Sequence, residues 1–402
     1  MATRATHNAL ADVGSVGMVD TQFLDLPEPV ALDCGRELHP VRIAYETYGD
    51  LAPARDNVVL VCHALSGDAH AAGVARAPAA SGTRDGFGAE ERDGAASPAL
   101  GWWDGMIGPG KAFDTERYFV VSTNLLGGCR GTTGPSSTNP ATGRPYGSDF
   151  PVITVADMVR AQRAFLAELG IERLAAVAGG SLGGMQALEW AVLYPEAVDA
   201  IIPIASTHAL RPQGVAWNAI ARNAITSDPD WQGGHYYGTG RAPTRGMGVA
   251  RMIGHITYLS AEALERKFGR RLQFADDIRY VLAEPEFQVE SYLRHQAAKF
   301  VERFDANTYL YMSRALSYFD LARDHGGGRL VDAVRNVRAR TLLIAFSSDW
   351  LYPPSDSEEL AAALRAAGKE VELHVIDAPY GHDCFLLEEA LQTPIIRRFL
   401  AR

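Results

Sequence analysis

Short and almost uninterrupted apolar segments, separated by stretches with helical spacing, constrain the fold of this chain most. Seven such segments occur: VRIAYETY from Val41, NVVLVCHAL from Asn57, YFVVSTN from Tyr118, LAAVAGG from Leu174, DAIIPIAS from Asp199, RTLLIAF from Arg340 and VELHVID from Val371. Continuous rather than alternating hydrophobic strands are typical of strands buried on both faces of a parallel sheet. The pattern predicts an α/β protein with a mostly parallel sheet and helices on both faces.

Apolar residues at helical spacing predict helices over 155–169, 184–194, 355–367 and 383–400, so predicted strands and helices alternate as in βαβ units. Two regions lack this alternation. The aperiodic stretch 71–100, rich in Ala, Gly, Asp and Arg, predicts a long surface loop, and only helical pieces occupy about 210–323. The glycine-rich segment GGGR, at 326–329, predicts a linker that returns the chain to the sheet. We expect a core of 21–209 and 326–402, interrupted by a helical lid insertion, 210–325.

Composition excludes several classes of protein. The chain has 402 residues, 47% of them hydrophobic and 21% charged, which is enough material for a large core and an inserted subdomain. A net charge of -10 without a dense Lys/Arg tract argues against nucleic acid or an anionic membrane as partner and favours a small-molecule substrate. Four cysteines without a CxxC pair, no signal-like h-region and no apolar stretch of about 18 residues predict a cytoplasmic protein.

The strand LAAVAGG runs directly into Gly179-Gly180-Ser181-Leu182-Gly183, and the helical pattern GMQALEWAVLY follows. This order places a GxSxG motif in the strand, turn and helix context of a nucleophile elbow. Glycine at both ends of the motif permits close packing of strand and helix around a strained serine, and the helix N-terminus places amides near a developing oxyanion. We therefore predict that Ser181 is a nucleophile rather than an incidental serine in a glycine-rich turn.

A nucleophilic serine needs a base and an orienting carboxylate, which in this architecture follow it in the order serine, acid, histidine. Asp349 follows RTLLIAF and precedes a Pro-Pro turn, whereas His382 follows VELHVID and the loop Ala-Pro-Tyr-Gly. Both lie at carboxyl ends of strands, where open α/β sheets place their sites. An Asp before a helix is often an N-cap, and Asp377 is an alternative acid. The order and positions nevertheless predict a Ser181, Asp349 and His382 triad on an α/β-hydrolase fold.

The strand NVVLVCHAL ends at His63 to Asp68, where the second oxyanion donor of this fold usually lies. We predict that the backbone N–H groups of Leu65 and Leu182 form the oxyanion hole. His63, His70 and Asp68 could suggest a metal site, but two histidines and one aspartate on a loop are more often polar pocket lining, so no metal is expected.

Longer motifs carry a family resemblance. The segments HALSGDAHAAG, GWWDGMIGPGKAFDT, NLLGGCRGTTGPSSTNPATGRPYG, GGSLGGMQALEWAVLYP, ARMIGHITYLS, FDANTYLYMSRALSYFD and PYGHDCFLLE resemble the homoserine O-acyltransferases of methionine biosynthesis. The resemblance extends from about Val41 to the end and weakens in the first 20 residues and in 71–100.

The resemblance implies an activity and further site residues. It implies that Arg251, in ARMIGHITY, binds the carboxylate of the amino acid and that Asp383, in GHD, contacts its polar groups. Without the resemblance, Arg251 could equally lie on a solvated face of a lid helix. The implied reaction is ping-pong acetylation of L-homoserine through an acyl-serine, with acetyl-CoA as co-substrate and no cofactor. The lid would exclude water, and because lids of this family also pack subunits together, a homodimer is expected.

The identity of the acyl donor depends on Leu351. By resemblance, members of the family that use succinyl-CoA tend to carry arginine at this position, and an unpaired succinyl carboxylate in a dry pocket would cost several kcal/mol. Leucine favours acetyl-CoA, although Arg130, in GGCRGTTG, could reach the same space. The alternatives are homoserine O-succinyltransferase, serine O-acyltransferase, an esterase with the same triad, and a non-catalytic binding protein.

Overall fold

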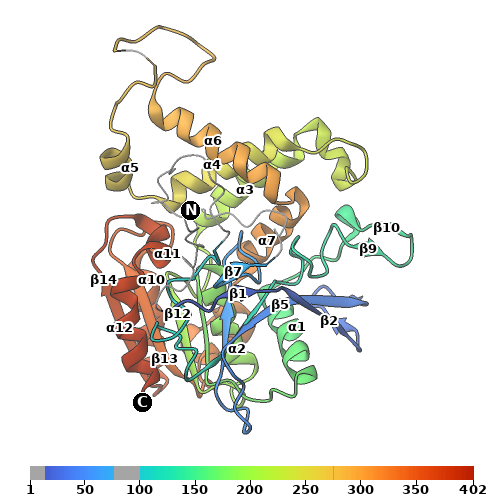
Figure 1. Cartoon of the computed structure of the whole chain (residues 1–402), viewed down its shortest axis with the longest axis vertical. Coiled ribbons are helices and arrows are strands. Elements are labelled where there is room, and N and C mark those ends of the chain that lie inside the picture. Colours follow the sequence, from blue (N-terminus) through green and yellow to red (C-terminus); the bar gives the residue numbers. More distant parts are fainter. Residues whose placement is uncertain (1–13, 77–99, 275) are drawn as a thin grey trace, which may run out of the picture.

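The computed structural model describes residues 14–76 and 100–402, except residue 275. Its centre is an eight-stranded sheet with the order β14-β13-β12-β11-β6-β8-β5-β2 (Figure 1). The strands are β2 (Gln22–Leu26), β5 (Val41–Tyr48), β6 (Val58–Cys62), β8 (Phe119–Thr123), β11 (Ala176–Gly180), β12 (Ala200–Ile204), β13 (Arg340–Phe346) and β14 (Val371–Ile376). Neighbours from β14 to β8 are parallel, whereas β5 and β2 join as antiparallel strands.

All seven predicted strands belong to this sheet, so the mostly parallel α/β architecture is confirmed. The edge strand β2, with the sequence QFLDL, was not predicted from the sequence. Its pairing with β5 covers only one edge, and Phe23 remains 56% exposed. Most side chains of β2 are exposed, so the strand lacks the continuous apolar run by which strands buried on both faces are recognised.

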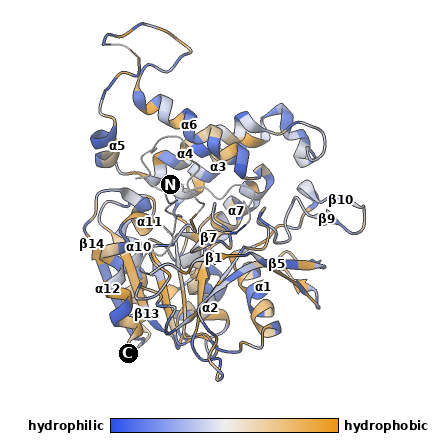
Figure 2. Cartoon of the chain, viewed as in Figure 1, coloured by the Kyte–Doolittle hydropathy of each residue, from blue (hydrophilic) through white to orange (hydrophobic). Residues whose placement is uncertain are grey.

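Burial on both faces of the sheet explains the uninterrupted apolar strands. In β6, Val58, Leu60 and Cys62 belong to one core cluster, whereas Val59 and Val61 belong to the other. The first cluster includes residues of the helices α1 (Val155–Glu168), α2 (Leu182–Leu193) and α10 (Pro354–Ala366); the second includes residues of α12 (Glu389–Leu400) and of the segment 103–113. Figure 2 shows the hydrophobic colour concentrated in the strands of the sheet.

The predicted helices 155–169 and 355–367 are confirmed as α1 and α10, and the helix predicted to begin at 184 begins two residues earlier as α2. The single helix predicted over 383–400 is wrong. A 3-10 turn (Gly381–Asp383), α11 (Cys384–Leu387) and α12 replace it, with Glu388 non-helical at φ -98° and ψ 45°. Side chains stabilise the break, because Trp103 Nε1 and Gln392 Nε2 both donate to the Phe385 carbonyl, at 3.2 and 3.3 Å.

The expected surface loop 71–100 is also partly wrong. Ala71 and Ala72 are buried, and β7 (Val74–Ala75) pairs with β1 (Met18–Val19). The Tyr48 hydroxyl accepts from the amides of Ala71 and Ala72 at 2.9 and 3.1 Å, which holds this segment against the core. The rest of the expected loop, 77–99, lies outside the described residues.

Helices occupy the whole segment between β12 and β13 apart from its connections. They are α3 (Pro212–Thr226), α4 (Thr244–Tyr258), α5 (Ala261–Lys267), α6 (Gln288–Arg303), α7 (Ala306–Tyr318), α8 (Leu321–Gly326) and α9 (Leu330–Ala333). α3, α4 and α6 lie together above one end of the sheet (Figure 1) and share a small core that includes Ile225, Met247, Ala250 and Phe300. α8 ends at Gly326, and Gly327 and Gly328 follow it with φ of 56° and 91°, as expected for the predicted return turn.

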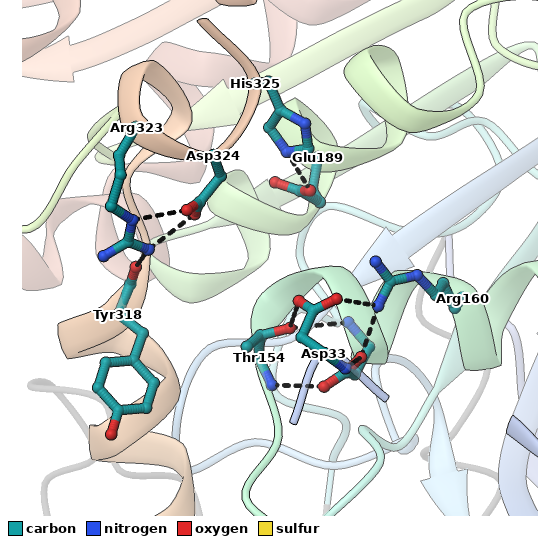
Figure 3. Close-up of polar contacts among 9 residues, drawn as sticks. Asp33, Thr154, Arg160, Glu189, Tyr318, Arg323, Asp324 and His325 are labelled. Atoms are coloured by element: carbon teal, nitrogen blue, oxygen red, sulfur yellow. Dashed lines mark hydrogen bonds and ion pairs between the residues drawn. The ribbon is translucent and has the colours of Figure 1, made fainter. Parts of the chain in front are cut away.

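Polar contacts join separate parts of the core (Figure 3). His325 on α8 lies 2.7 Å from Glu189 on α2, so the helical segment returns to the sheet at this point. At the start of α1, Asp33 accepts from Thr154 at 2.6 Å and pairs with Arg160 at 2.7 Å. The described residues also form three two-stranded sheets: β1 with β7, β3 (Val30–Ala31) with β4 (Glu37–Leu38), and β9 (Thr138–Asn139) with β10 (Arg144–Pro145). None of the helices in the described part of the chain combines the length and the apolar composition that a membrane-spanning helix requires.

Candidate active site

Ser181 stands at the sharp turn between β11 and α2. Its backbone has φ 58° and ψ -121°, a conformation that non-glycine residues rarely adopt and that is concentrated at functional sites. The flanking glycines permit close packing, because a Cβ on Gly179 would lie 2.6 Å from the carbonyl carbon of Gly183 on α2, and a Cβ on Gly183 would lie 2.1 Å from the carbonyl oxygen of Cys62 on β6. The structure therefore places Ser181 on the strained elbow that its sequence context predicts.

Asp349 and His382 form a buried pair. His382 Nδ1 lies 2.8 Å from Asp349 Oδ2, and Asp349 Oδ1 accepts from the amides of Leu351 and Tyr352, both at 3.0 Å. Because the carboxylate oxygen accepts, Nδ1 carries the proton and Nε2 is left as an acceptor. Asp377, the alternative acid, instead accepts from the Ser347 hydroxyl at 2.7 Å.

Shared neighbours bring Ser181 and His382 to one place. The Tyr352 ring lies 5.0 Å from the His382 ring, and burial raises the pKa of the Tyr352 phenol while the adjacent Ser181 hydroxyl opposes the rise. Phe385 lies 5.4 Å from the His382 ring and packs so closely on Gly180 that a Cβ there would be 2.2 Å away. The hydrogen bonds of the described residues include none between Ser181 and His382; such bonds are often long without substrate.

The two predicted oxyanion amides, of Leu65 and Leu182, belong to peptides whose carbonyl groups are held by side chains. His63 Nδ1 lies 2.7 Å from the Ala64 carbonyl, and the Leu125 amide donates to His63 Nε2 at 3.1 Å. His63 is thus the Nδ1–H tautomer, and burial lowers its pKa. The Ser206 hydroxyl donates to the Ser181 carbonyl at 2.9 Å. Both peptide planes are fixed.

Gln186, on α2, connects these two peptide segments. Its role was not predicted from the sequence. Its Nε2 donates to the carbonyls of His63 and Leu182, at 3.3 and 3.2 Å, while its Oε1 accepts from Gln162 at 2.8 Å. All of these groups are buried. The available signal was a glutamine within a mostly apolar helix, because a buried amide side chain requires internal hydrogen bonds.

The residues that could have suggested a metal site have other partners. His70 Nδ1 lies 3.0 Å from Glu46 Oε2, and Asp68 accepts from the His70 amide at 2.9 Å. In the part of the chain that the structure describes, no group of three or more His, Cys, Asp or Glu side chains could hold a metal ion.

Arg251 and Asp383 lie close to the triad, and both are buried. Arg251, on α4, has its Cζ 4.4 Å from the centre of the Phe300 ring and 5.9 Å from that of Tyr258, which in turn lies 6.1 Å from the His382 ring. Burial lowers the pKa of Arg251, and the Asp383 charge opposes this. Burial raises the pKa of Asp383 to about 7, against the charges of His382 and Arg251. Arg251 is therefore not a solvated lid residue.

A pocket of about 40 Å³ adjoins Ser181. Its wall includes Leu65 and Leu351 together with three tyrosines that sequence reasoning did not single out, Tyr258, Tyr309 and Tyr352. Arg130 does not line this pocket; it lines a separate cavity of about 850 Å³. The space next to the serine is small, and both apolar and polar side chains line it.

Comparisons with known proteins agree with this geometry. A profile of the alpha/beta hydrolase fold matches residues 57–389. The chain is 50% identical, over 96% of its length and 94% of the relative, to a homoserine O-acetyltransferase from Solidesulfovibrio magneticus. The structure of homoserine O-acetyltransferase from Bacillus anthracis superposes with a TM-score of 0.84 at 32% identity, covering 96% of this chain and 98% of the other. Esterase E22 gives 0.81, also at 32%, covering 95% and 100%. The chain belongs to the homoserine O-acetyltransferase family and has the α/β-hydrolase fold.

Proposed function

We propose that this enzyme transfers the acetyl group of acetyl-CoA to the hydroxyl of L-homoserine. The observation that carries the proposal is the position of Arg251 and Asp383: a buried cation and a buried carboxyl group beside a serine, histidine and aspartate arrangement. An α-amino acid carries the complementary carboxylate and ammonium groups. The names of relatives at about half identity, homoserine O-acetyltransferase, agree with this choice.

The first half-reaction acylates Ser181. Nε2 of His382 takes the hydroxyl proton as Ser181 Oγ attacks the thioester carbonyl, and Asp349 stabilises the resulting imidazolium through Nδ1–H. The amides of Leu65 and Leu182 donate to the oxyanion. The C–S bond then breaks, the sulfur receives the proton from His382, and CoA leaves an acetyl-serine. His63 and Ser206 act as positioning residues, since they hold the carbonyls of the two oxyanion peptides.

The second half-reaction transfers the acetyl group to the amino acid. Arg251 binds the homoserine carboxylate and ionised Asp383 accepts from its ammonium, which places the side-chain hydroxyl at the acetyl-serine. Its proton passes to His382 Nε2, its oxygen attacks the acetyl carbonyl, and Ser181 is regenerated with that proton. The small volume of the pocket beside Ser181, about 40 Å³, supports preference for acetyl transfer over hydrolysis, because it leaves little room for water.

Leu351 supports acetyl-CoA as donor. Its side chain lines the Ser181 pocket, whose described lining residues include no Lys or Arg; Arg130 belongs to the larger cavity, and Arg251 is assigned to the homoserine carboxylate. An esterase remains the rival function, favoured by the similarity to esterase E22. It would need no amino-acid clamp such as Arg251 and Asp383.

Mass spectrometry of the products tests the proposal. Purified enzyme is incubated with acetyl-CoA or succinyl-CoA, and with homoserine, serine or no acceptor. We expect O-acetylhomoserine as the main product. O-acetylserine or a succinyl ester would identify a different acyltransferase, and acetate formed at an equal rate with and without homoserine would identify a hydrolase.

We also propose that the enzyme is a cytoplasmic homodimer. The segment between α5 and α6 exposes Phe274, Tyr280 and Leu282, by 72%, 91% and 103%, and α4 exposes Val249 and Ile256. Such a concentration of exposed apolar side chains favours a protein partner, and a second copy of the lid fits this chemistry. Light scattering after gel filtration should give twice the chain mass. The cytoplasmic location is supported separately, because four free cysteines agree with a reducing compartment.

A further inference from the structure

The pocket beside Ser181 cannot contain a whole acyl-CoA molecule. Its volume is about 40 Å³, whereas a second cavity under the C-terminal end of α6 measures about 850 Å³. Sites for drug-sized ligands and cofactors occupy about 300–1,000 Å³. If Ser181 is acylated by a CoA thioester, the nucleotide part of the donor needs a separate site, and the larger cavity has the required size.

The larger cavity reaches the loop that carries a proposed oxyanion amide. Asp68, Ala69 and His70 form part of its wall, and Arg303, also in the wall, donates from Nη1 to the Ser66 carbonyl at 3.3 Å. Ser66 directly follows Leu65, which lines the Ser181 pocket. The two spaces therefore meet the same short loop, one at Leu65 and the other at Asp68.

Two arginines from distant parts of the chain come together on the cavity wall. Arg130 follows β8 and Arg303 is the last residue of α6, and Arg130 Nη2 donates to the Arg303 carbonyl. Both are half-buried. A guanidinium carries five N–H donors in a planar fork that fits phosphate oxygens, so a bond to a carbonyl does not preclude phosphate binding. Burial lowers the pKa of Arg303 to about 10, so it stays charged at neutral pH.

The carboxylates of the cavity wall mostly have partners. Asp305 accepts from Tyr236, Tyr237 and the Thr308 amide. Asp20 pairs with Arg76 at 3.3 Å. Asp68 accepts from the His70 amide, while Glu302 is exposed to solvent. Hydrogen bonds do not cancel the charge of a carboxylate, so an anionic ligand would be attracted locally, at the guanidinium groups of Arg130 and Arg303, rather than over the whole wall.

We propose that this cavity binds the nucleotide part of the acyl-CoA donor and that Arg130 and Arg303 bind its phosphate groups. The pantetheine arm then runs past Ser66 and presents the thioester to Ser181. This proposal rests on the proposed acyltransferase function, since it supplies the binding site which that reaction requires.

The test compares acetyl-CoA with S-acetylpantetheine, which has the same thioester and arm but no nucleotide and no phosphoester group. Steady-state kcat/KM with homoserine is measured for the wild type, Arg130→Gln and Arg303→Gln. Arg314→Gln is the matched control, because Arg314 lines a different cavity. Each cavity variant should lose about tenfold or more in kcat/KM for acetyl-CoA, because it lacks a charge-assisted hydrogen bond to a phosphate group. It should stay within about twofold of wild type for S-acetylpantetheine, and Arg314→Gln should change neither.

The phosphate-free donor also reports on folding, because its use requires an intact Ser181 site. Equal losses for both donors would show that the arginines support the structure only, and no loss for acetyl-CoA would place the phosphates elsewhere; either result overturns the proposal. A wild-type enzyme with equal kcat/KM for acetyl-CoA and S-acetylpantetheine would also overturn the proposal. If the wild type acetylates nothing, the proposed function fails, and calorimetry with CoA and pantetheine then tests the cavity separately. Tighter binding of CoA that depends on Arg130 and Arg303 supports the site, whereas equal binding overturns it.

Discussion

Asp349→Asn tests the proposed triad through the orientation of one side chain. In the wild type, Asp349 Oδ1 accepts two backbone amides, of Leu351 and Tyr352, and Oδ2 accepts from His382 Nδ1. An asparagine has one oxygen and one NH₂ group to divide between these partners. If its NH₂ faced the two amides, both buried donors would lose their acceptor, at about 1–3 kcal/mol each.

The asparagine oxygen will therefore stay on the backbone amides, and even the lower limit of about 2 kcal/mol favours this orientation by about 30-fold. Its NH₂ then donates to His382 Nδ1, which forces the imidazole proton onto Nε2. In that tautomer His382 cannot accept the Ser181 proton, and the carboxylate that stabilises the imidazolium is also lost. We expect kcat to fall by about 10³–10⁴-fold, equivalent to about 4–5.5 kcal/mol.

The assay is stopped-flow release of CoA with a thiol reagent, which follows the first half-reaction. Asp377→Asn is the matched control, because Asp377 also follows a sheet strand but accepts from Ser347 rather than from His382. It should change kcat by less than about threefold, and both variants should keep the wild-type melting temperature within a few degrees. A folded Asp349→Asn enzyme that retains a tenth of the wild-type kcat would refute the reasoning, as would an equal loss in Asp377→Asn.

Four further predictions concern the other site residues. Ser181→Ala should abolish acyl transfer without loss of folding, and acetyl-CoA alone should add one acetyl mass to wild-type Ser181; an acetylated cysteine in the peptide map would contradict the mechanism. Arg251→Ala should raise KM for homoserine by at least tenfold but leave the pre-steady-state burst of CoA, and loss of the burst would show that Arg251 serves the donor or the fold. Leu351→Arg should shift the ratio of kcat/KM toward succinyl-CoA, and an unchanged ratio would show that Leu351 does not select the donor. Because the pKa of Asp383 is raised to about 7, kcat/KM for homoserine should increase as the pH rises through about 7 in the wild type, and Asp383→Asn should remove that step. The folded state binds this proton more tightly than the unfolded state, so the free energy of unfolding of the wild type should fall as the pH rises from about 4 to 7. Chemical denaturation should show that the stability of Asp383→Asn relative to the wild type increases over the same pH range.

The sequence was sufficient for features that local patterns specify. Continuous apolar runs predicted a parallel sheet with two covered faces, and the strand, turn and helix around Ser181 predicted the elbow that the structure contains. These predictions succeed because strand burial and turn geometry depend on residues a few positions apart. Edge strand β2 and the break at Glu388 were missed, since each depends on partners far along the chain: β5 for the strand, and Trp103 with Gln392 for the break.

Only the tertiary structure decided which distant groups meet. The order of residues placed both Asp349 and Asp377 after strands, but packing brought Asp349 alone of these two to His382. Spacing along a helix could not tell whether Arg251 faces solvent, whereas the structure buries it against Phe300. The physical reason is that hydrogen bonds and burial between segments depend on how elements pack in three dimensions. Local hydrophobic periodicity specifies the elements themselves and carries no direct record of which side chains they bring together.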